Sequence, residues 1–453
     1  MTIAFEQAWR ALGGGELPAE IIVEDEPVLA ARLPVADLAT ATVTAYACAA
    51  AELAAVRGRP VTGPLRVNAA RVATSFTSDR HLRAGDRSFT GFAPESAFFP
   101  AADGWVRTHA NYPHHLARLR AALGDDIAAA IAARPAAQVE AEVLAAGGLA
   151  FAARTREDWT TSAPGQAVAG LPLIAQHSSP AVVRAKHALP SGPLLPAAGI
   201  RVLDLTRVIA GPVATRALAL LGADVLRVDS PGLPELEGQH LDMDLGKRST
   251  LLDLTRPADR AAFDELLDRA DVVVTGYRPG ALDRFGLSPA ALLDRRPDLV
   301  IAQLSAWGSA GPWADRRGFD SLVQAATGIA LWEGTVDRPG VLPAQALDHG
   351  TGYLLAAAVL RALAARFTTG GGHVAELALA RTAKWLMDLP PREQVAGREP
   401  EPTTVELAGY TLVRPAFVLP GGPDTWPVPP RPWGADPPAW RRPSTVVIDV
   451  CRY

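Results

Sequence analysis

The chain has 453 residues, of which 49% are hydrophobic and 20% are charged, and its formal net charge is −4 at pH 7. That length allows two or three hydrophobic cores, and that composition is typical of a globular protein. The slightly negative charge gives no sign of the excess of Lys and Arg that nucleic-acid binding needs, so we expect no nucleic-acid partner.

Cysteine content and hydropathy predict a cytoplasmic protein. The two cysteines, Cys48 and Cys451, cannot build a disulfide framework, which fits a reducing compartment. Residues 1–6 show neither the basic nor the apolar region of a signal peptide. The longest apolar stretch, 354–365, includes Arg361 and is shorter than the roughly 20 residues of a membrane span. We therefore expect a cytoplasmic location and no membrane partner.

Four blocks follow one another along the chain. Residues 1–185 are Ala-rich and mostly helical in pattern, and they predict a smaller N-terminal α+β domain. Residues 186–198 are rich in Pro, Ser and Gly and predict a linker. Residues 199–390 alternate strand and helix patterns and predict the large domain. Residues 391–453 are Pro-rich, and we expect them to lie extended on the large domain, because proline fits neither a helix nor a central strand.

The alternation in the large domain predicts a parallel sheet. Residues 200–205 and 224–229 have strand composition, and residues 213–221 between them have helical character, with Pro212 as the expected first helical residue. A strand, a helix and a strand within about 30 residues form a βαβ unit, whose strands pair in parallel. Further strands are expected at 250–254, 271–274 and 298–302. The fold class is therefore α/β, with a doubly wound, Rossmann-like large domain.

One pattern occurs twice in the chain. An Asp precedes an Ala-rich helix that runs to an Arg, and a short segment rich in Ala with a central Arg follows at nearly the same spacing. The members, in order, are Asp37, Arg57 and 69–73, and then Asp348, Arg366 and 379–383. The N-terminal domain is therefore interpreted as a partial second copy of the same fold, without its nucleotide-binding half.

Motif searching excludes the common nucleotide and hydrolase sites. The chain has no Gly-x-x-x-x-Gly-Lys phosphate loop, no Gly-x-Gly-x-x-Gly after a strand and no Gly-x-Ser-x-Gly elbow. We therefore expect neither ATP nor a dinucleotide. His109, His114 and His115 lie close together, but their spacing matches no common metal site, and we interpret them as an exposed polar turn.

Three polar loops belong to the strands of the large domain. Residues 207–212 and 276–285 each follow a strand, and residues 246–249 place Lys247 and Arg248 in a turn. Ligands of open α/β sheets bind at the carboxyl ends of strands, where a helix N-terminus favours an anion. Each loop alone is more simply interpreted as a solvated turn. Together they suit a ligand with several phosphates and an adenine ring.

Asp348 has two interpretations. It precedes Gly-Thr-Gly and a long Ala/Leu helix, so it is a good candidate for the N-cap of that helix. The same position suits a carboxylate nucleophile, because the positive end of the helix dipole would keep it ionised. Gly350 and Gly352 would then leave room for a thioester to approach, and nearby backbone N–H groups could hold the developing oxyanion.

The stretch from about residue 198 to residue 389 resembles the large domain of the family III CoA-transferases. Six motifs occur in the order of the family, so chance is a poor explanation. They are 201–205 with 210–212, 221–225, 246–249 with 252–254, 278–280 with 285–287, 305–308 with 311–312, and 348–352.

This resemblance implies that Asp348 is a catalytic nucleophile. In the family, the aspartate attacks an acyl-CoA to give a mixed anhydride and then carries CoA as an aspartyl thioester to an acceptor carboxylic acid. CoA and its esters are therefore expected as substrates, with no permanently bound cofactor and no metal. The residues expected to bind CoA are Val208, Ile209, Ala210, Lys247, Arg248, Gly276, Tyr277, Arg284, Arg317, Gly318, Phe319 and Asp320.

The order of the segments departs from the family. The small domain normally follows the large one, whereas here the matching segments 98–105 and 156–159 come first. Family members interlock as dimers, so we expect a homodimer unless the fused partial copy replaces that exchange. The glycine-rich lid of some transferases is not evident, and residues 83–87 stand roughly where it would fall.

Two other functions stay open. Related acyl-CoA racemases use a His and an Asp as paired bases, and their Gly-His-Asp motif is Gly318-Phe319-Asp320 here. Phenylalanine cannot move a proton, which disfavours racemisation by that route. The other alternative is an inactive scaffold that binds CoA esters. The intact Asp348 argues against it, and the rearranged small domain argues for it. Neither the acyl group nor the acceptor acid has a recognisable signature.

Overall fold

A seven-stranded sheet forms the centre of the large domain. The computed structural model describes residues 2–24, 26–89, 91–180, 189–335, 337–391 and 401–441. The strands run parallel in the order β11-β10-β9-β12-β13-β14, and β8 closes the edge antiparallel to β14. They are β8 (Ala175–Ser178), β9 (Arg201–Leu205), β10 (Asp224–Asp229), β11 (Arg248–Leu251), β12 (Val272–Thr275), β13 (Val300–Ser305) and β14 (His373–Ala378). The predicted doubly wound parallel sheet is confirmed.

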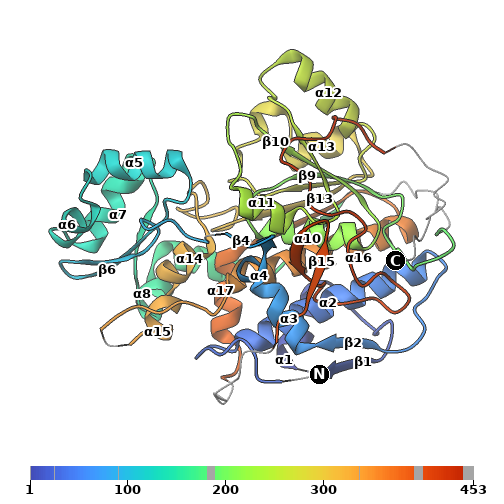
Figure 1. Ribbon diagram of the computed structural model, residues 1–453, viewed down its shortest axis with the longest axis horizontal. Coiled ribbons are helices and arrows are strands. Elements are labelled where there is room, and N and C mark those ends of the chain that lie inside the picture. The colour runs from blue at the N-terminus through green and yellow to red at the C-terminus, as the bar shows by residue number, and fades with distance from the viewer. Residues whose placement is uncertain are drawn as a thin grey trace.

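Helices cover both faces of this sheet, because each strand turns alternate side chains towards two different cores. Leu203 and Val273 pack with α12 and α13 on one face, and Val202 and Val272 pack with α10 and α16 on the other. Figure 1 shows α12 and α13 above the sheet and α16 below it. These helices are α10 (Ala210–Leu220), α12 (Pro257–Leu267), α13 (Pro289–Arg295) and α16 (Ala346–Thr368).

The predicted bounds of these elements differ from the observed ones by a few residues. The helix expected at 213–221 begins at Ala210, so Pro212 is its third residue and not its first. Proline is tolerated there because the first N–H groups of a helix have no partner within it. The shorter elements of the large domain are α11 (Glu237–Met243), η1 (Asp283–Phe285), α14 (Asp320–Thr327), α15 (Ile329–Glu333) and α17 (Leu379–Asp388).

A small parallel βαβα unit begins the chain and packs against the large domain. Its strands β1 and β2 pair in parallel, and its central helix α2 lies along α16. Helix α2 has the length and apolar content of a membrane span, as core helices often do, and 83% of its most apolar window is buried inside the protein. The elements are α1 (Ile3–Ala11), β1 (Ile21–Glu24), α2 (Val35–Val56), β2 (Leu65–Asn68) and α3 (Ala69–Phe76).

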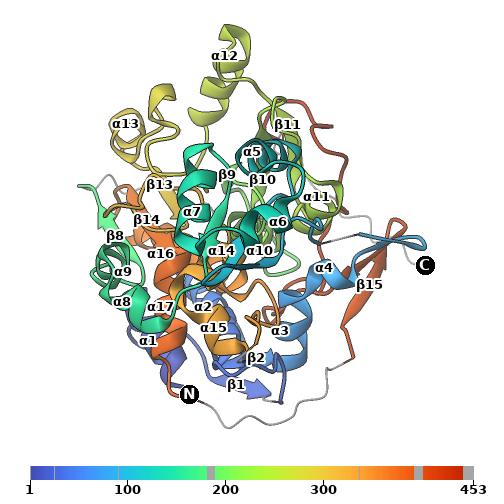
Figure 2. The ribbon, with the colours of Figure 1, turned by 90° about the vertical axis from the view of Figure 1, so that its left-hand side faces the viewer.

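A separate α+β unit follows, with a core of its own between β5-β6-β7 and three helices. It projects beside α14 of the large domain, as Figures 1 and 2 show. Its elements are β5 (Phe98–Ala101), β6 (Gly104–Thr108), α5 (Pro113–Leu123), α6 (Ile127–Ala132), α7 (Ala136–Ala145) and β7 (Ala150–Ala152). Helices α8 (Arg156–Thr161) and α9 (Ala163–Ala169) then lead to β8 at the edge of the large sheet.

The Pro-rich C-terminal segment is only partly as expected. Residues 404–413 contain no proline and form a hairpin, β15 (Thr404–Leu407) and β16 (Tyr410–Val413), and β16 is an inner strand of the sheet β15-β16-β3-β4. The expectation that this segment holds no central strand is therefore wrong. The hairpin formed by β3 (Arg83–Ala84) and β4 (Arg87–Ser88) follows α4 (Ser78–His81) and completes that sheet.

Beyond residue 413 the segment is extended and is anchored by tryptophans. The indole N–H groups of Trp426, Trp433 and Trp440 donate to Arg216 O, Asp229 Oδ2 and Leu266 O at 3.0, 2.9 and 3.0 Å. Residues 186–188 of the predicted linker lie outside the described residues, as do 392–400 and 442–453 of the C-terminal segment. The proposed division into domains stays a prediction.

Candidate active site

A cleft of about 300 Å³ opens at the carboxyl ends of β9 and β12, where the sheet order reverses. This is the position at which open α/β sheets bind ligands. The loops after both strands, the segment before α14, the start of α16 and helix α5 all contribute to its wall. The sequence-predicted residues that it brings together are Val208, Ile209, Ala210, Gly276, Tyr277, Arg317, Gly318, Phe319 and Asp348.

Asp348 lies at the inner end of this site, as the third residue of α16 and only 6% exposed. The helix is capped by another side chain, because Asp320 Oδ2 accepts the backbone N–H of Asp348 at 2.9 Å. Gln345, the N-cap residue, makes no side-chain cap hydrogen bond. The N-cap interpretation of Asp348 is therefore wrong, and its carboxyl group is left to face the cleft.

The electrostatic setting of Asp348 also differs from the expectation. Burial, and then the neighbouring charge of Asp320, raise the pKa of the Asp348 carboxyl well above its ordinary value. Burial raises the pKa of Asp320 to about 6, although hydrogen bonds from Gln324 and from two backbone N–H groups act in the opposite direction. The helix dipole does not offset this upward shift of the Asp348 pKa, because Asp320 already accepts the first N–H groups and adds a negative charge.

The two glycines after Asp348 serve helix packing. A methyl group on Gly350 would stand 2.6 Å from Leu38 Cδ2 of α2, and one on Gly352 would stand 2.5 Å from the Ala210 carbonyl oxygen of α10. Both glycines therefore let neighbouring helices approach α16. The expectation that they leave room for a thioester is wrong, because that room is filled by α2 and α10.

Five arginines line the cleft, and Asp348 is the only carboxylate among its described lining residues. Arg118 of α5 and Arg317 of the large domain both donate to the carbonyl oxygen of Gly147, at 3.2 and 3.4 Å, which joins the two walls. Arg207 is already paired with Glu235 at 3.3 Å and Arg316 with Glu140 at 3.6 Å, and the other guanidinium groups favour a ligand with several negative charges. The five are Arg118, Arg207, Arg278, Arg316 and Arg317.

Four predicted CoA-binding residues do not line this cleft. Lys247 is buried, and its Nζ lies 3.1 Å from Asp204 Oδ2, so the fold itself uses its charge. Arg248 forms an ion pair with Asp224 at 2.9 Å, and the guanidinium of Arg284 lies over the ring of Phe285. Asp320, the fourth, is buried and caps α16, as described above. The spacing of the sequence could not distinguish a loop cation that faces a ligand from one that faces the core.

Two histidines of the small α+β unit are buried. His109 and His115 are each 4% exposed, so the prediction of an exposed polar turn is wrong. The His109 ring stacks on Phe319 with 3.8 Å between ring centroids, and His115 lines the cleft beside it. Burial lowers the pKa of His109 well below its ordinary value and that of His115 to about 3, so both rings are neutral at pH 7. The described residues contain no group of three metal-ligating side chains.

The loop after β9 carries backbone strain. Val208 has a φ of 70°, a left-handed conformation that is rare for a β-branched residue. It directly precedes Ile209, the N-cap residue of α10, and both line the cleft. Strain of this kind costs about 1–3 kcal/mol and gathers at ligand-binding sites.

Comparison with known proteins gives one consistent family. The sequence profile described as CoA-transferase family III matches residues 4–184 and 197–414. A probable fatty acyl-CoA transferase of Mycobacterium tuberculosis is 37% identical over 203 residues, which are 42% of this chain and 52% of that protein. A formyl-CoA:oxalate CoA-transferase of Rhodopseudomonas palustris is 35% identical over 39% of this chain and 44% of its own length.

One crystal structure of the mycobacterial protein matches with a TM-score of 0.41 and 38% identity, over 43% of this chain and 56% of that one. The chain thus spans about half the length of these relatives.

Proposed function

Because the chain belongs to CoA-transferase family III, we propose that it transfers CoA from an acyl-CoA to a carboxylic acid through Asp348. Acyl-CoA and the free acid would be its substrates, with no resident cofactor, and we propose a cytoplasmic location for the reaction.

One observation carries this proposal. The cleft combines a buried carboxyl group with five arginines and an aromatic side chain, Tyr277. A CoA ester has the matching groups, namely several phosphates, an adenine ring and a thioester carbon at its far end. Guanidinium groups bind phosphates through charge-assisted hydrogen bonds, and a buried carboxylate is a better nucleophile than a hydrated one. The arrangement therefore supports CoA binding with the thioester directed to Asp348.

The proposed chemistry has two exchange reactions. The Asp348 carboxylate attacks the thioester carbon, the C–S bond breaks, and a mixed anhydride and CoA thiolate form. The thiolate attacks the Asp348 acyl carbon, which releases the first acid as a carboxylate and leaves an aspartyl-CoA thioester. The acceptor carboxylate then repeats the two steps in reverse, which yields the new acyl-CoA and restores the Asp348 carboxylate. No oxidant, reductant or metal is required.

The direct test is to trap the covalent intermediate. The protein is incubated with an acyl-CoA, treated with hydroxylamine and digested for mass spectrometry. A hydroxamate on the peptide that contains Asp348 is the expected result. Full transfer activity in Asp348→Ala would overturn the proposal. CoA binding with neither a hydroxamate nor turnover would favour the inactive scaffold.

A specific observation also supports a second candidate, proton exchange at the α-carbon of the acyl group. The sequence alone disfavoured it, since Phe319 replaces a histidine, but His115 lies in the same cleft as Asp348. A ring nitrogen of neutral His115 could take the α-proton, and the electron pair of the broken C–H bond would then form the thioester enolate. The protonated Asp348 could return a proton to the α-carbon on the other face.

The second candidate is tested with 2-methylbutanoyl-CoA in deuterated water. Deuterium at the α-carbon, detected by NMR, without any CoA transfer would favour it over the transferase. Exchange should then fall in His115→Gln. Unchanged exchange in that variant would rule out the role of His115.

A further inference from the structure

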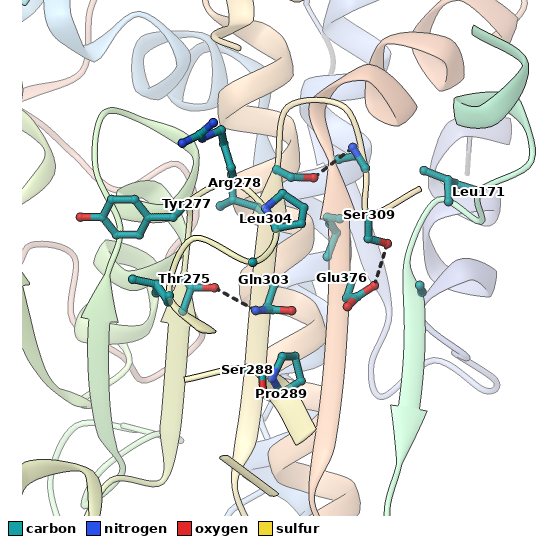
Figure 3. A pocket seen from close by; sticks show the side chains of 18 of the residues that line it. Leu171, Thr275, Tyr277, Arg278, Ser288, Pro289, Gln303, Leu304, Ser309 and Glu376 are labelled. Atoms are coloured by element: carbon teal, nitrogen blue, oxygen red, sulfur yellow. Dashed lines mark hydrogen bonds between the residues drawn. The ribbon is translucent and has the colours of Figure 1, made fainter. Parts of the chain in front are cut away.

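A second cavity, the side pocket, adjoins the cleft. It has a volume of about 200 Å³ and lies over the carboxyl ends of β12, β13 and β14. Figure 3 shows its side chains, with Thr275 and Gln303 on neighbouring strands, Glu376 beyond them and Leu171 at the opposite side. The volume is several times the ~30 Å³ that one water occupies, so the side pocket can hold an organic ligand.

Most of its wall is apolar or already satisfied. Leucines from four segments line it: Leu171, Leu282, Leu287, Leu304 and Leu377. The polar strand residues pair with each other or with the neighbouring loop. Gln303 Nε2 donates to Thr275 Oγ1, and Ser309 Oγ donates to Glu376 Oε2, each at 3.3 Å. Such a wall favours the body of an apolar molecule.

Arg381 is the exception among the lining residues. Its Nε donates to the carbonyl oxygen of Leu171 at 2.8 Å, but its Nη1 is buried and has no hydrogen-bond partner among the described residues. Burial lowers the pKa of this guanidinium, which nevertheless remains a cation at neutral pH. A buried donor without an acceptor is costly, so this nitrogen indicates a missing acceptor, and a carboxylate is the best match.

The side pocket borders the cleft, because Tyr277, Arg278, Leu304 and Ser305 line both. We propose that it binds a monocarboxylic acid with an apolar body, whose carboxylate is held by Arg381. Asp283 and Glu376 also line it, and their negative charges disfavour a second carboxylate on the ligand. The role of this acid as acceptor or product rests on the proposed function, whereas its binding does not.

The binding test uses hexanoate, with succinate as the dicarboxylate, and isothermal titration calorimetry. Hexanoate should bind, and Arg381→Gln should weaken it about tenfold or more, since a charge-assisted contact is lost. Arg71→Gln is a matched control. Arg71 is also the third residue of its helix, its Nε also donates to a carbonyl oxygen, of Pro415, and one of its Nη atoms is likewise buried without a partner. It lines neither the cleft nor the side pocket, so hexanoate affinity should be unchanged.

A second variant fills the side pocket without touching Arg381. Ala175 lines it from the edge strand β8, directly opposite Glu376, so Ala175→Phe should reduce hexanoate binding while CoA affinity stays the same. The proposal is overturned if hexanoate fails to bind, if both variants bind it as the wild type does, or if succinate binds more tightly.

Trapping at Asp348 tests the transferase proposal separately from the side-pocket proposal. Hexanoate binding that depends on Arg381, without any hydroxamate on Asp348, would leave the side pocket assigned and would remove the transferase proposal. A hydroxamate on Asp348 with hexanoate affinity equal in wild type, Arg381→Gln and Ala175→Phe would do the reverse.

Discussion

Two segments of the molecule have the same order of elements and different surroundings. The first is α2-β2-α3, and the second is α16-β14-α17. Their long helices have 22 and 23 residues and lie against each other, and each has an aspartate as its third residue, Asp37 and Asp348. The strand that follows α2 belongs to a two-stranded sheet, whereas the strand that follows α16 belongs to the seven-stranded sheet.

The difference shows what turns a helix-start aspartate into a candidate nucleophile. Asp348 is 6% exposed, lies beside Asp320 and faces the arginine-lined cleft. Asp37 is half-buried and lines neither the cleft nor the side pocket. The same local sequence pattern thus supports chemistry only where a complete α/β domain supplies strand ends and loops around it.

The largest expected effect separates these two aspartates. Asp348→Asn should lower CoA transfer by about a thousandfold or more, because the amide cannot form the anhydride. Asp37→Asn should leave transfer within about twofold of wild type. Steady-state kinetics with circular dichroism as a check of folding measure both. Equal losses in the two variants would mean that the fold and not the nucleophile was affected.

The next effect concerns the negative charge of Asp320 beside Asp348. Asp320→Asn keeps an oxygen to accept the Asp348 N–H and removes the negative charge that raises the pKa of Asp348. The proposed transfer requires the ionised Asp348, so the rate should rise with pH, and its acid limb should move to lower pH by about one unit in the variant. A profile of kcat/KM against pH measures the shift. An unmoved acid limb would show that Asp320 does not control this proton.

The same substitution has a consequence for stability, with a definite sign. The folded pKa of Asp320, about 6, lies above the ordinary 3.8, so between these values the folded state holds a proton that the unfolded state has released. Stability from this group therefore falls as pH rises from about 4 to 6. Asp320→Asn should raise Tm more at pH 7 than at pH 4. Equal shifts at both pH values would contradict the assignment.

The sequence predicted the large domain well because its signals are local. Runs such as 224–229 have one stable solution in a parallel sheet, and the observed strand is Asp224–Asp229. Asp348 was likewise placed by its motif, and it does line the cleft together with Val208 and Tyr277.

What the sequence could not show depends on distant contacts. Lys247 is a loop cation by pattern, but its partner Asp204 lies 43 residues away, and the pairing turns it into the core. Asp320 is 28 residues from Asp348, whose backbone N–H it accepts, and the His109 ring stacks on Phe319 across the two units. Their sequence neighbours are themselves largely polar, as in Arg107-Thr108-His109 and Gly246-Lys247-Arg248, so no local pattern marks these residues as buried polar groups that need a partner.

A smaller effect is expected when the glycines of α16 are replaced by the alanines of α2. The helix α2 has Ala39 and Ala41 where α16 has Gly350 and Gly352. Alanine gains about 1 kcal/mol over glycine in a helix, but at Gly352 it would meet the backbone of α10. Gly352→Ala should therefore destabilise the protein by about 1–2 kcal/mol. Gly350→Ala should be close to neutral, because the Leu38 side chain can move. Urea denaturation measures both, and equal changes would show that α10 yields as easily as Leu38.

The last effect concerns the loop after β9 that contains Val208. This loop lies beside α16, and α2 has no such loop beside it. Val208→Gly relieves a strain of about 1–3 kcal/mol and loses about 0.5–1 kcal/mol to the greater freedom of glycine in the unfolded chain, so stability should rise by between about 0 and 2.5 kcal/mol. CoA affinity should fall, because the loop is no longer held in one conformation. Ala408→Gly is the control: Ala408 also has a left-handed φ, of 54°, but lies in the β15–β16 turn and away from the cleft. It should gain stability without any change in CoA affinity, as thermal melting and titration with CoA would show. If Val208→Gly kept full affinity, the strain would belong to folding and not to the ligand.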